Sequence, residues 1–150
     1  MKQLLQNIQE RISQIPEIKY VDENWGQLDY FAPAPPVQFP AVLITLSGGT
    51  FTNLGIDRHQ NPQHRQQGTL MVEITLAHLK ITNSSRQAPQ AQKDRAWFVW
   101  NMADKVHAVL QGFRPYEKSG AMVREGMQYI QRDDGIQELK LTYSVGLNDV

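Results

Sequence analysis

Two apolar runs decide the fold of this chain: FPAVLITLSGGTFT at residues 39–52 and GTLMVEITLAHL at residues 68–79. In the second run every second residue from Leu70 to Leu76 is apolar, which is the pattern of a half-buried strand. Between the runs lie fifteen residues rich in Gln, His and Arg, NLGIDRHQNPQHRQQ at 53–67. Two such strands joined by so long a polar segment predict a β-hairpin arm that extends beyond the body of its domain.

The arm, defined as residues 53–67, is the candidate functional element because extended polar hairpins usually contact a partner subunit or a filament. It contains one Ile and one Leu, so it buries too little apolar area to offset the entropy of ordering. We therefore expect the arm to be mobile, or ordered only by contacts with other subunits. The candidate residues for an oligomer or tail contact are the charged and imidazole side chains Asp57, Arg58, His59, His64 and Arg65.

Length and composition describe an ordinary globular protein. With 150 residues, 41% hydrophobic and 20% charged, the chain is expected to form a single domain over residues 1–150. No apolar run reaches the roughly 18 residues that cross a bilayer, and the polar N-terminal segment does not resemble a signal peptide. The absence of cysteine excludes disulfides and thiolate metal sites. We expect synthesis in a cytoplasm and no membrane partner.

The charge balance argues against a protein that binds nucleic acid tightly. Fifteen basic and fifteen acidic residues give a formal net charge of zero, whereas tight binding to phosphates needs a basic excess on one face. Seventeen glutamines supply polar surface without charge. A neutral surface tolerates self-association. The composition therefore favours assembly.

The remaining elements predict an α+β fold. Apolar residues at spacings of three and four predict helices at 1–15 and 95–111, the first ended by Pro16 and the second by Gly112. The other segments are a short strand at 18–21, an irregular proline-containing connector at 22–38, a polar linker at 81–94, and a C-terminal hairpin with strands at 128–132 and 138–146. We expect a mostly antiparallel sheet, with the second helix covering one of its faces.

Histidine supplies few convincing catalytic or metal-binding arrangements. His59 and His64 lie five apart on the arm with Asp57 nearby, but a zinc or nickel site would need a third ligand, and none has a suitable spacing. We therefore interpret the arm histidines as solvated residues or subunit contacts. His78 falls on the apolar side of its strand, which favours a partly buried histidine over a catalytic base.

Neighbouring carboxylates also have structural explanations. Asp133 and Asp134 precede Gly135, and aspartate accepts backbone hydrogen bonds in tight turns, so they predict the turn of the C-terminal hairpin. His107, one turn after Asp104 on the helix, predicts a surface pair. We expect no catalytic residue among them.

Two further patterns could indicate ligand binding, but each also has a structural explanation. Ser47-Gly48-Gly49 follows a strand but lacks the spacing of a phosphate-binding loop, so it predicts a bulge or turn. Trp97 and Trp100 could form a stacking platform, although helix core, with an oligomer contact on the remaining apolar surface, is the simpler interpretation. We expect no cofactor and no metal.

In this order of elements the chain resembles the tail-terminator proteins of long-tailed bacteriophages, the lambda-like minor tail protein U family. The resemblance covers residues 4–147 and is carried by four stretches together: FPAV at 39–42, MVEITL at 71–76, YIQRDDG at 129–135 and LKLTYSVGL at 139–147. The His- and Gln-rich arm and the prolines at 33–36 depart from the family pattern.

The resemblance implies a structural, non-enzymatic role in a virion tail, after synthesis in the bacterial host cytoplasm. Such proteins form a ring, hexameric in the family, on the last ring of the tail tube, stop its polymerisation and present a surface to the head-tail connector. DNA would pass through a neutral ring without specific binding. Related neck and head-completion proteins share this layout and remain an alternative. A small ligand-binding or enzymatic α+β domain, with His78 or the tryptophans in a pocket, is the alternative from another class.

Overall fold

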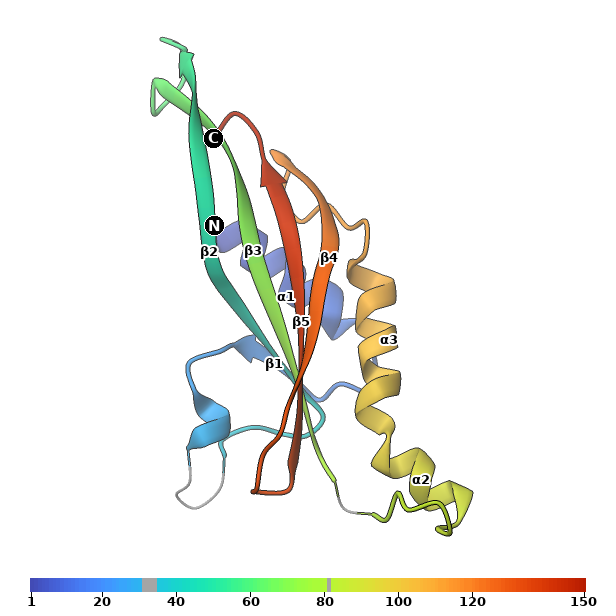
Figure 1. The fold of residues 1–150 in the computed structure, drawn as a ribbon. Helices are drawn as coiled ribbons and strands as arrows, with labels where there is room; N and C mark the ends of the chain where they lie inside the picture. The colour runs from blue at the N-terminus through green and yellow to red at the C-terminus, as the bar shows by residue number, and fades with distance from the viewer. Residues whose placement is uncertain (31–34, 81) are drawn as a thin grey trace.

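The computed structural model describes residues 1–30, 35–80 and 82–150, and their elements form one mixed sheet with helices against it (Figure 1). The five strands lie in the order β1-β2-β3-β5-β4. The predicted α+β class with a mostly antiparallel sheet is confirmed. The elements are α1 (Lys2–Ser13), β1 (Tyr20–Glu23), a 3-10 turn η1 (Gln27–Asp29), β2 (Ala41–Ile56), β3 (His64–Leu79), α2 (Gln90–Ala96), α3 (Phe98–Leu110), β4 (Ser119–Ile130) and β5 (Ile136–Leu147).

The long strands pair in antiparallel fashion: β2 with β3, β3 with β5, and β5 with β4. Only β1 is parallel to its neighbour, and it pairs with residues 41–44 of β2. Because side chains alternate along a strand, this register places the apolar sets of β2, β3 and β5 on the same face. The predicted strands therefore share one sheet, as expected.

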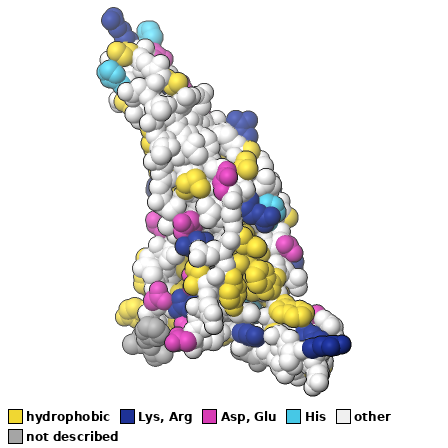
Figure 2. Space-filling model, viewed as in Figure 1, with side chains coloured by type: hydrophobic (Ala, Val, Ile, Leu, Met, Phe, Trp, Pro, Cys, Tyr) yellow, Lys and Arg dark blue, Asp and Glu magenta, His cyan; other side chains and the backbone are white. Residues whose placement is uncertain are grey.

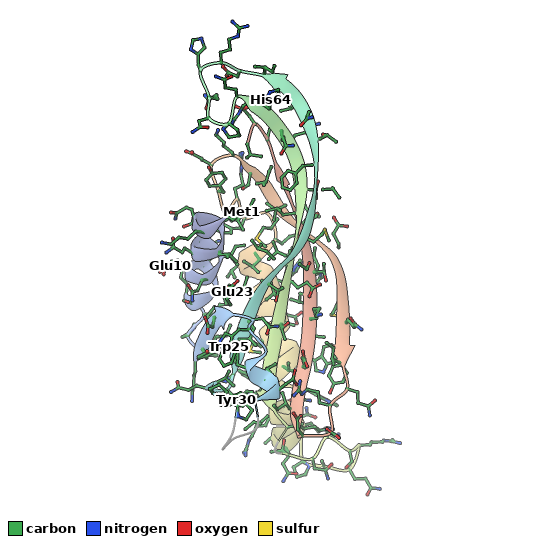
Figure 3. The ribbon with its side chains drawn as sticks, turned by 90° about the vertical axis from the view of Figure 1, so that its left-hand side faces the viewer. Met1, Glu10, Glu23, Trp25, Tyr30 and His64 are labelled. Atoms are coloured by element: carbon green, nitrogen blue, oxygen red, sulfur yellow. The ribbon has the colours of Figure 1, made fainter. Side chains whose placement is uncertain are left out.

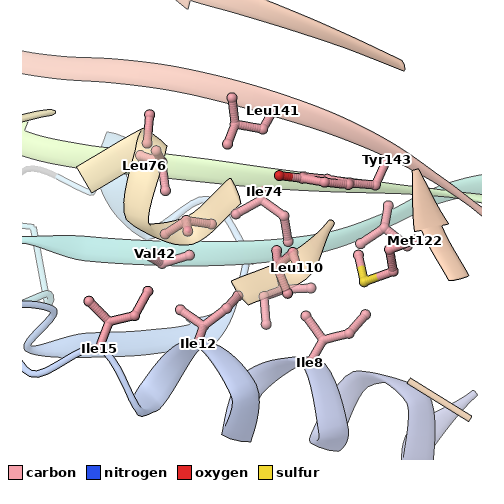
Figure 4. Packing of buried hydrophobic residues seen from close by; sticks show 14 of the residues in the cluster. Ile8, Ile12, Ile15, Val42, Ile74, Leu76, Leu110, Met122, Leu141 and Tyr143 are labelled. Atoms are coloured by element: carbon pink, nitrogen blue, oxygen red, sulfur yellow. The ribbon is translucent and has the colours of Figure 1, made fainter. Parts of the chain in front are cut away.

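That apolar face is covered by α1 and α3, and the packing of their side chains forms the main core (Figure 4). From α1 it receives Leu4, Ile8 and Ile12, which recur at helical spacing and are all but inaccessible. From the sheet it receives Ile74, Leu141, Tyr143 and their apolar neighbours. From α3 it receives Val99, Met102, Ala103, Val106 and Leu110. The helix that the sequence placed at 95–111 does cover this face.

A smaller core lies on the opposite face, at the end of the sheet where β2 begins. Here Ala41, Leu43, Ala77 and Ile136 pack with Leu28 and the partly buried Phe39. Arg132 fastens the β4–β5 turn to this layer, because its guanidinium donates to the Asp134, Glu138 and Asp29 carboxylates and to the Leu28 carbonyl. Asp134 Oδ1 accepts the Ile136 N–H at 3.2 Å, and Gly135 has φ 80°. The turn interpretation of the Asp pair is confirmed.

The boundaries of several predicted elements need correction. The short strand lies at Tyr20–Glu23 instead of 18–21. The predicted linker at 81–94 contains most of α2. The sequence pattern did not indicate this helix, because only its residue Ala96 is buried and no apolar stripe marks it. Trp97 (φ −101°, ψ 13°) separates α2 from α3, so the predicted helix at 95–111 is two helices.

The start of the fourth strand also differs from the prediction. β4 begins at Ser119, nine residues before the predicted start at 128, and its register shifts between Ser119 and Met122 and again between Arg124 and Gly126. These bulges and the mostly exposed side chains remove the alternation by which strands are recognised. Part of the connector at 22–38 forms β1 and η1, and its residues 31–34 lie outside the described residues. Within the described part of the chain, no helix is long and apolar enough to span a membrane.

Candidate assembly surface

The arm is a continuation of the sheet. The β2–β3 ladder extends to the pair Ile56–His64, with a register shift between Asn53 and Gly55, so only residues 57–63 form the tip. Figure 3 shows His64 at the far end of the two strands, well beyond the helices. The expectation that the arm is mobile, or ordered only by other subunits, is therefore wrong for residues 53–56 and 64–67, because backbone hydrogen bonds between the two strands order them within the chain. For the tip it stays a prediction.

The base of the arm is held by the C-terminal segment. Arg65, only 5% exposed, donates from Nε to Asp149 Oδ1 at 2.7 Å and from Nη1 to the Pro62 carbonyl at 3.0 Å. The backbone groups of Gln66 and Val150 exchange two hydrogen bonds of 3.0 and 3.1 Å. The hydrogen bond from Arg65 holds the pKa of the Asp149 carboxyl below its ordinary value. The arm therefore leaves the body at a fixed point.

The five predicted contact residues are brought together at the arm but have different surroundings. Asp57 orders the tip, since its Oδ1 accepts the His59 N–H at 2.9 Å and its backbone N–H donates to Gln63 O at 2.8 Å. Arg58, His59 and His64 are exposed, whereas Arg65 is committed to Asp149. Among the described residues, no group of three or more His, Asp or Glu side chains could hold a metal ion. A role in subunit contact stays a prediction for the exposed residues of the arm.

Apolar side chains on β2 were missed by the sequence reasoning, which treated the arm as a polar segment. Phe51, Leu54 and Ile56 are all exposed, and Phe51 lies across from Gly68 on β3. A Cβ atom at Gly68 would come within 2.4 Å of the Phe51 ring, so this glycine makes room for the aromatic side chain. The signal in the sequence was the presence of these three apolar residues within six positions of a strand-forming run.

The sheet has two open edges. Among the described residues, no strand pairs with the outer side of β2 beyond Ile44, or with the outer side of β4. The open part of β2, residues 46–56, contains no charged residue and no proline, which are the usual devices that prevent strands from pairing. We refer to residues 46–56 as the β2 edge and to the outer side of residues 125–130 as the β4 edge. The β2 edge presents unpaired backbone groups to a partner strand. On β4 the Met122 backbone is bonded to Gly112 and Phe113, and the Arg124 N–H donates to Gln111 Oε1, so its outer side is open only from residue 125 onward.

Beside the β4 edge lies an apolar patch, defined by Trp97, Trp100, Met127 and Tyr129, each between 38% and 58% exposed. The Trp100 and Tyr129 rings stack with centroids 5.7 Å apart and planes 18° from parallel. Figure 2 shows hydrophobic side chains gathered beside the lower part of the sheet, toward α3. The tryptophans thus lie at the margin of the core, and the apolar surface expected on this helix is present.

The two internal histidines face the core. His107 Nδ1 lies 3.1 Å from the buried Tyr143 hydroxyl, so the predicted surface pair with Asp104 is wrong. His78 packs its ring against Phe98 with centroids 5.1 Å apart, and its Nδ1 is buried without a hydrogen-bond partner among the described residues. Burial, and then the nearby Lys19 charge, lower the pKa of His78. Neither histidine has the partners of a catalytic base.

Comparison with known proteins identifies no family. No protein-family model matches the chain, and no curated protein matches its sequence. Among solved structures, the chain is similar to a chain of the virion of a native gene transfer agent particle, with a TM-score of 0.47 and 8% sequence identity, over 98% of this chain and 92% of that chain. At this TM-score and identity, the likeness carries no functional inference.

Proposed function

We propose that this protein is a structural subunit of a phage tail, which caps the tail tube as a homo-oligomeric ring, hexameric as in the family it resembles. The ring ends polymerisation of the tube and forms the surface that the head-tail connector meets. The observation that carries this proposal is the pair of open edges on one sheet, with the arm extending from one of them.

Two different edges on opposite sides of a subunit favour head-to-tail contacts. The β2 edge and the β4 edge are distinct surfaces, so a contact between them is heterologous, and repeated rotation closes such contacts into a ring. The β2 edge lacks the charged side chains and prolines with which monomeric sheet proteins protect their edges, and the register shifts at 46–48 and 53–55 are the devices of that kind that it has. A free strand edge of this kind is most stable when it is paired.

The charge balance fits a tube component. A net charge of zero gives the phosphates of DNA no basic surplus to bind, so DNA could pass through a ring of these subunits without being held. To end polymerisation, one side of the ring would match the last ring of the tube, and the other would lack the surface for a further tube layer. The head-tail connector would then meet that second side.

The test is negative-stain electron microscopy of the purified protein mixed with tail tubes assembled from the tube protein encoded beside it. We expect one ring at one end of each tube and no further growth when tube protein is added. The variant Thr50→Lys with Thr52→Lys places charges on the β2 edge and should abolish the rings. The control variant Gln87→Lys with Gln92→Lys adds the same charge at exposed positions in and before α2 and should cap normally.

Unbound tubes that continue to grow in the presence of the protein would contradict the proposal. Binding to an isolated portal or connector, with no effect on tube growth, would assign the protein to the neck, as in head-completion proteins.

A further inference from the structure

Strand directions at the two edges are those of an antiparallel pair. Because β2–β3, β3–β5 and β5–β4 are all antiparallel, β2 and β5 run one way while β3 and β4 run the other. All copies in a cyclic ring have the same orientation relative to its axis. A β4 edge placed beside the β2 edge of the next copy would therefore continue the alternation as one more antiparallel pair.

The strand β1 limits where the two edges can meet. It occupies residues 41–44 of β2, and across β3 and β5 these residues are level with residues 127–130 of β4. An unshifted neighbour would press residues 127–130 against β1. A shift of four residues, about 14 Å along the strand, clears β1 and, being an even number, keeps the faces of the two sheets matched.

In the shifted register the apolar patch meets the β2 edge of the next copy on the face that the helices cover. Tyr129 falls opposite Leu46, Met127 opposite Gly49, and Gly126 opposite Thr50. The pairing ends there, because residues 111–113 are bonded to the outer side of Met122 and Arg124. The register shifts in both strands, at 46–48 and at 124–126, are included in this alignment. Leu46 would extend the Trp100–Tyr129 stack.

The charges at the two edges also suit each other. The β2 edge has no charged residue, and the only charges on β4, Arg124 and Glu125, are of opposite sign. Pairing would therefore bring no like charges together, and it would cover the exposed patch.

We propose that the ring, whose existence rests on the proposed function, closes by antiparallel pairing of the β4 edge with the β2 edge of the next copy, shifted by four residues. The partner is a second copy of this chain, and β1 sets the register by blocking the lower part of β2. The sheets then join into one continuous wall around the ring.

Cysteine cross-linking tests this register, because the chain contains no cysteine of its own. The matched pairs are Gly48→Cys with Gln128→Cys, and Thr50→Cys with Gly126→Cys, each made in one chain. Within a chain these positions lie on strands separated by β3 and β5, about 14 Å apart, which exceeds the roughly 7 Å Cα limit of a disulfide. Any disulfide must therefore join two copies.

On mild oxidation, at least one matched pair should give a ladder of covalent oligomers on a non-reducing gel. Its cross-linking should be on the order of tenfold faster than that of the control, because matched thiols are held at high effective concentration. The control is Asn53→Cys with Gln128→Cys, which lies out of register and on the opposite face. Two pairs are used because the geometry at paired residues alternates along an antiparallel ladder.

The outcomes separate this inference from the proposed function. Rings seen by native mass spectrometry or on tail tubes, with neither matched pair cross-linking faster than the control, would overturn the edge pairing and leave the ring in place. Dimers formed by Gly48→Cys alone would also overturn it, because they would indicate two-fold pairing of β2 with itself. The absence of any ring, in solution or on tubes, would contradict the proposed function itself.

Discussion

At the scale of single residues, Gly68 is required by the fold and Gly146 is not. A Cβ at position 68 would come within 2.4 Å of the Phe51 ring and 2.5 Å of the Thr50 carbonyl oxygen, and the latter belongs to the backbone and cannot rotate away. At position 146 a Cβ would meet nothing within 4 Å. The two glycines are on adjacent strands and close together, so they form a matched pair for substitution.

We predict that Gly68→Ala lowers the free energy of unfolding by about 1–3 kcal/mol, which is typical of overpacking at a tight site. Gly146→Ala should leave it unchanged or raise it slightly, because alanine reduces the entropy of the unfolded chain without strain. Urea unfolding followed by tryptophan fluorescence measures both. Equal stability of the two variants would show that the contact between Phe51 and Gly68 does not constrain the strand.

Arg65 shows what the sequence can and cannot reveal about a charged residue. Its position in a polar segment indicated an exposed contact residue, yet its guanidinium pairs with Asp149, 84 positions away along the chain. Nothing local marks that pairing, because it depends on where the C-terminal segment runs across the finished sheet. Arg58 and His59 on the tip of the arm are exposed, as the polar pattern of this segment predicted.

At the scale of elements, the strands that could be predicted are those with one buried face. β3 and β5 alternate because one side meets the helices, and their patterns correctly indicated strands. β4 is an edge strand with exposed residues on both faces, so most of it carries no pattern. The apolar patch could not be predicted for a related reason. Helical periodicity shows that Trp97 and Trp100 are near the core, but it does not show that the sheet ends beside them.

The arm separates into a base that the fold needs and a tip that it does not. Since Ile56 and His64 are paired, replacing residues 57–63 with Asn-Gly would join them through a two-residue hairpin turn. We predict that this short-arm variant lowers the free energy of unfolding by no more than about 1–2 kcal/mol, because the tip is mostly exposed and the main loss is the Pro62 carbonyl that accepts from the buried Arg65. We also predict that it forms fewer rings, as measured by native mass spectrometry.

A control for the short arm keeps the length of the tip and changes its side chains, with Arg58→Gln and His59→Gln. If the candidate contact residues are responsible, this variant should lose rings to a similar degree while its unfolding midpoint stays unchanged. A short-arm variant that forms rings as fully as the natural chain would remove the tip from the assembly surface.

At the scale of the whole molecule, stability in mild acid depends on two histidines whose neutral form the fold favours. Burial is the main cause of the lowered pKa of both His78 and His107, to which the Lys19 charge adds for His78 and the Arg124 charge for His107. The unfolded chain has no such burial, so its histidines take up protons at a higher pH, near the ordinary value of about 6.5. Proton uptake then favours the unfolded state.

The direction of the pH dependence follows. Above about pH 6.5 both states keep these histidines neutral and the fold has its full stability, which is lost progressively as the pH falls toward the lowered pKa values of the folded state. The carboxyls of Asp134 and Asp149, whose pKa values are lowered by Arg132 and Arg65, lose their contribution only at still lower pH. The interval between about pH 6.5 and 5 therefore isolates the histidines.

We predict that the urea midpoint falls between pH 7.5 and 5.5, and that His78→Leu reduces this fall, because the titrating ring is gone while its apolar contact with Phe98 is kept. The control is His59→Gln, whose ring is exposed on the arm tip and should leave the slope unchanged. The buried Oε1 of Gln137, opposite His78 in the ladder, has no partner in the described chain and cannot accept a hydrogen bond from a charged imidazole without moving. If His78→Leu kept the full pH dependence, the fall would belong to other groups, and the pKa of His78 would not differ between the folded and unfolded states.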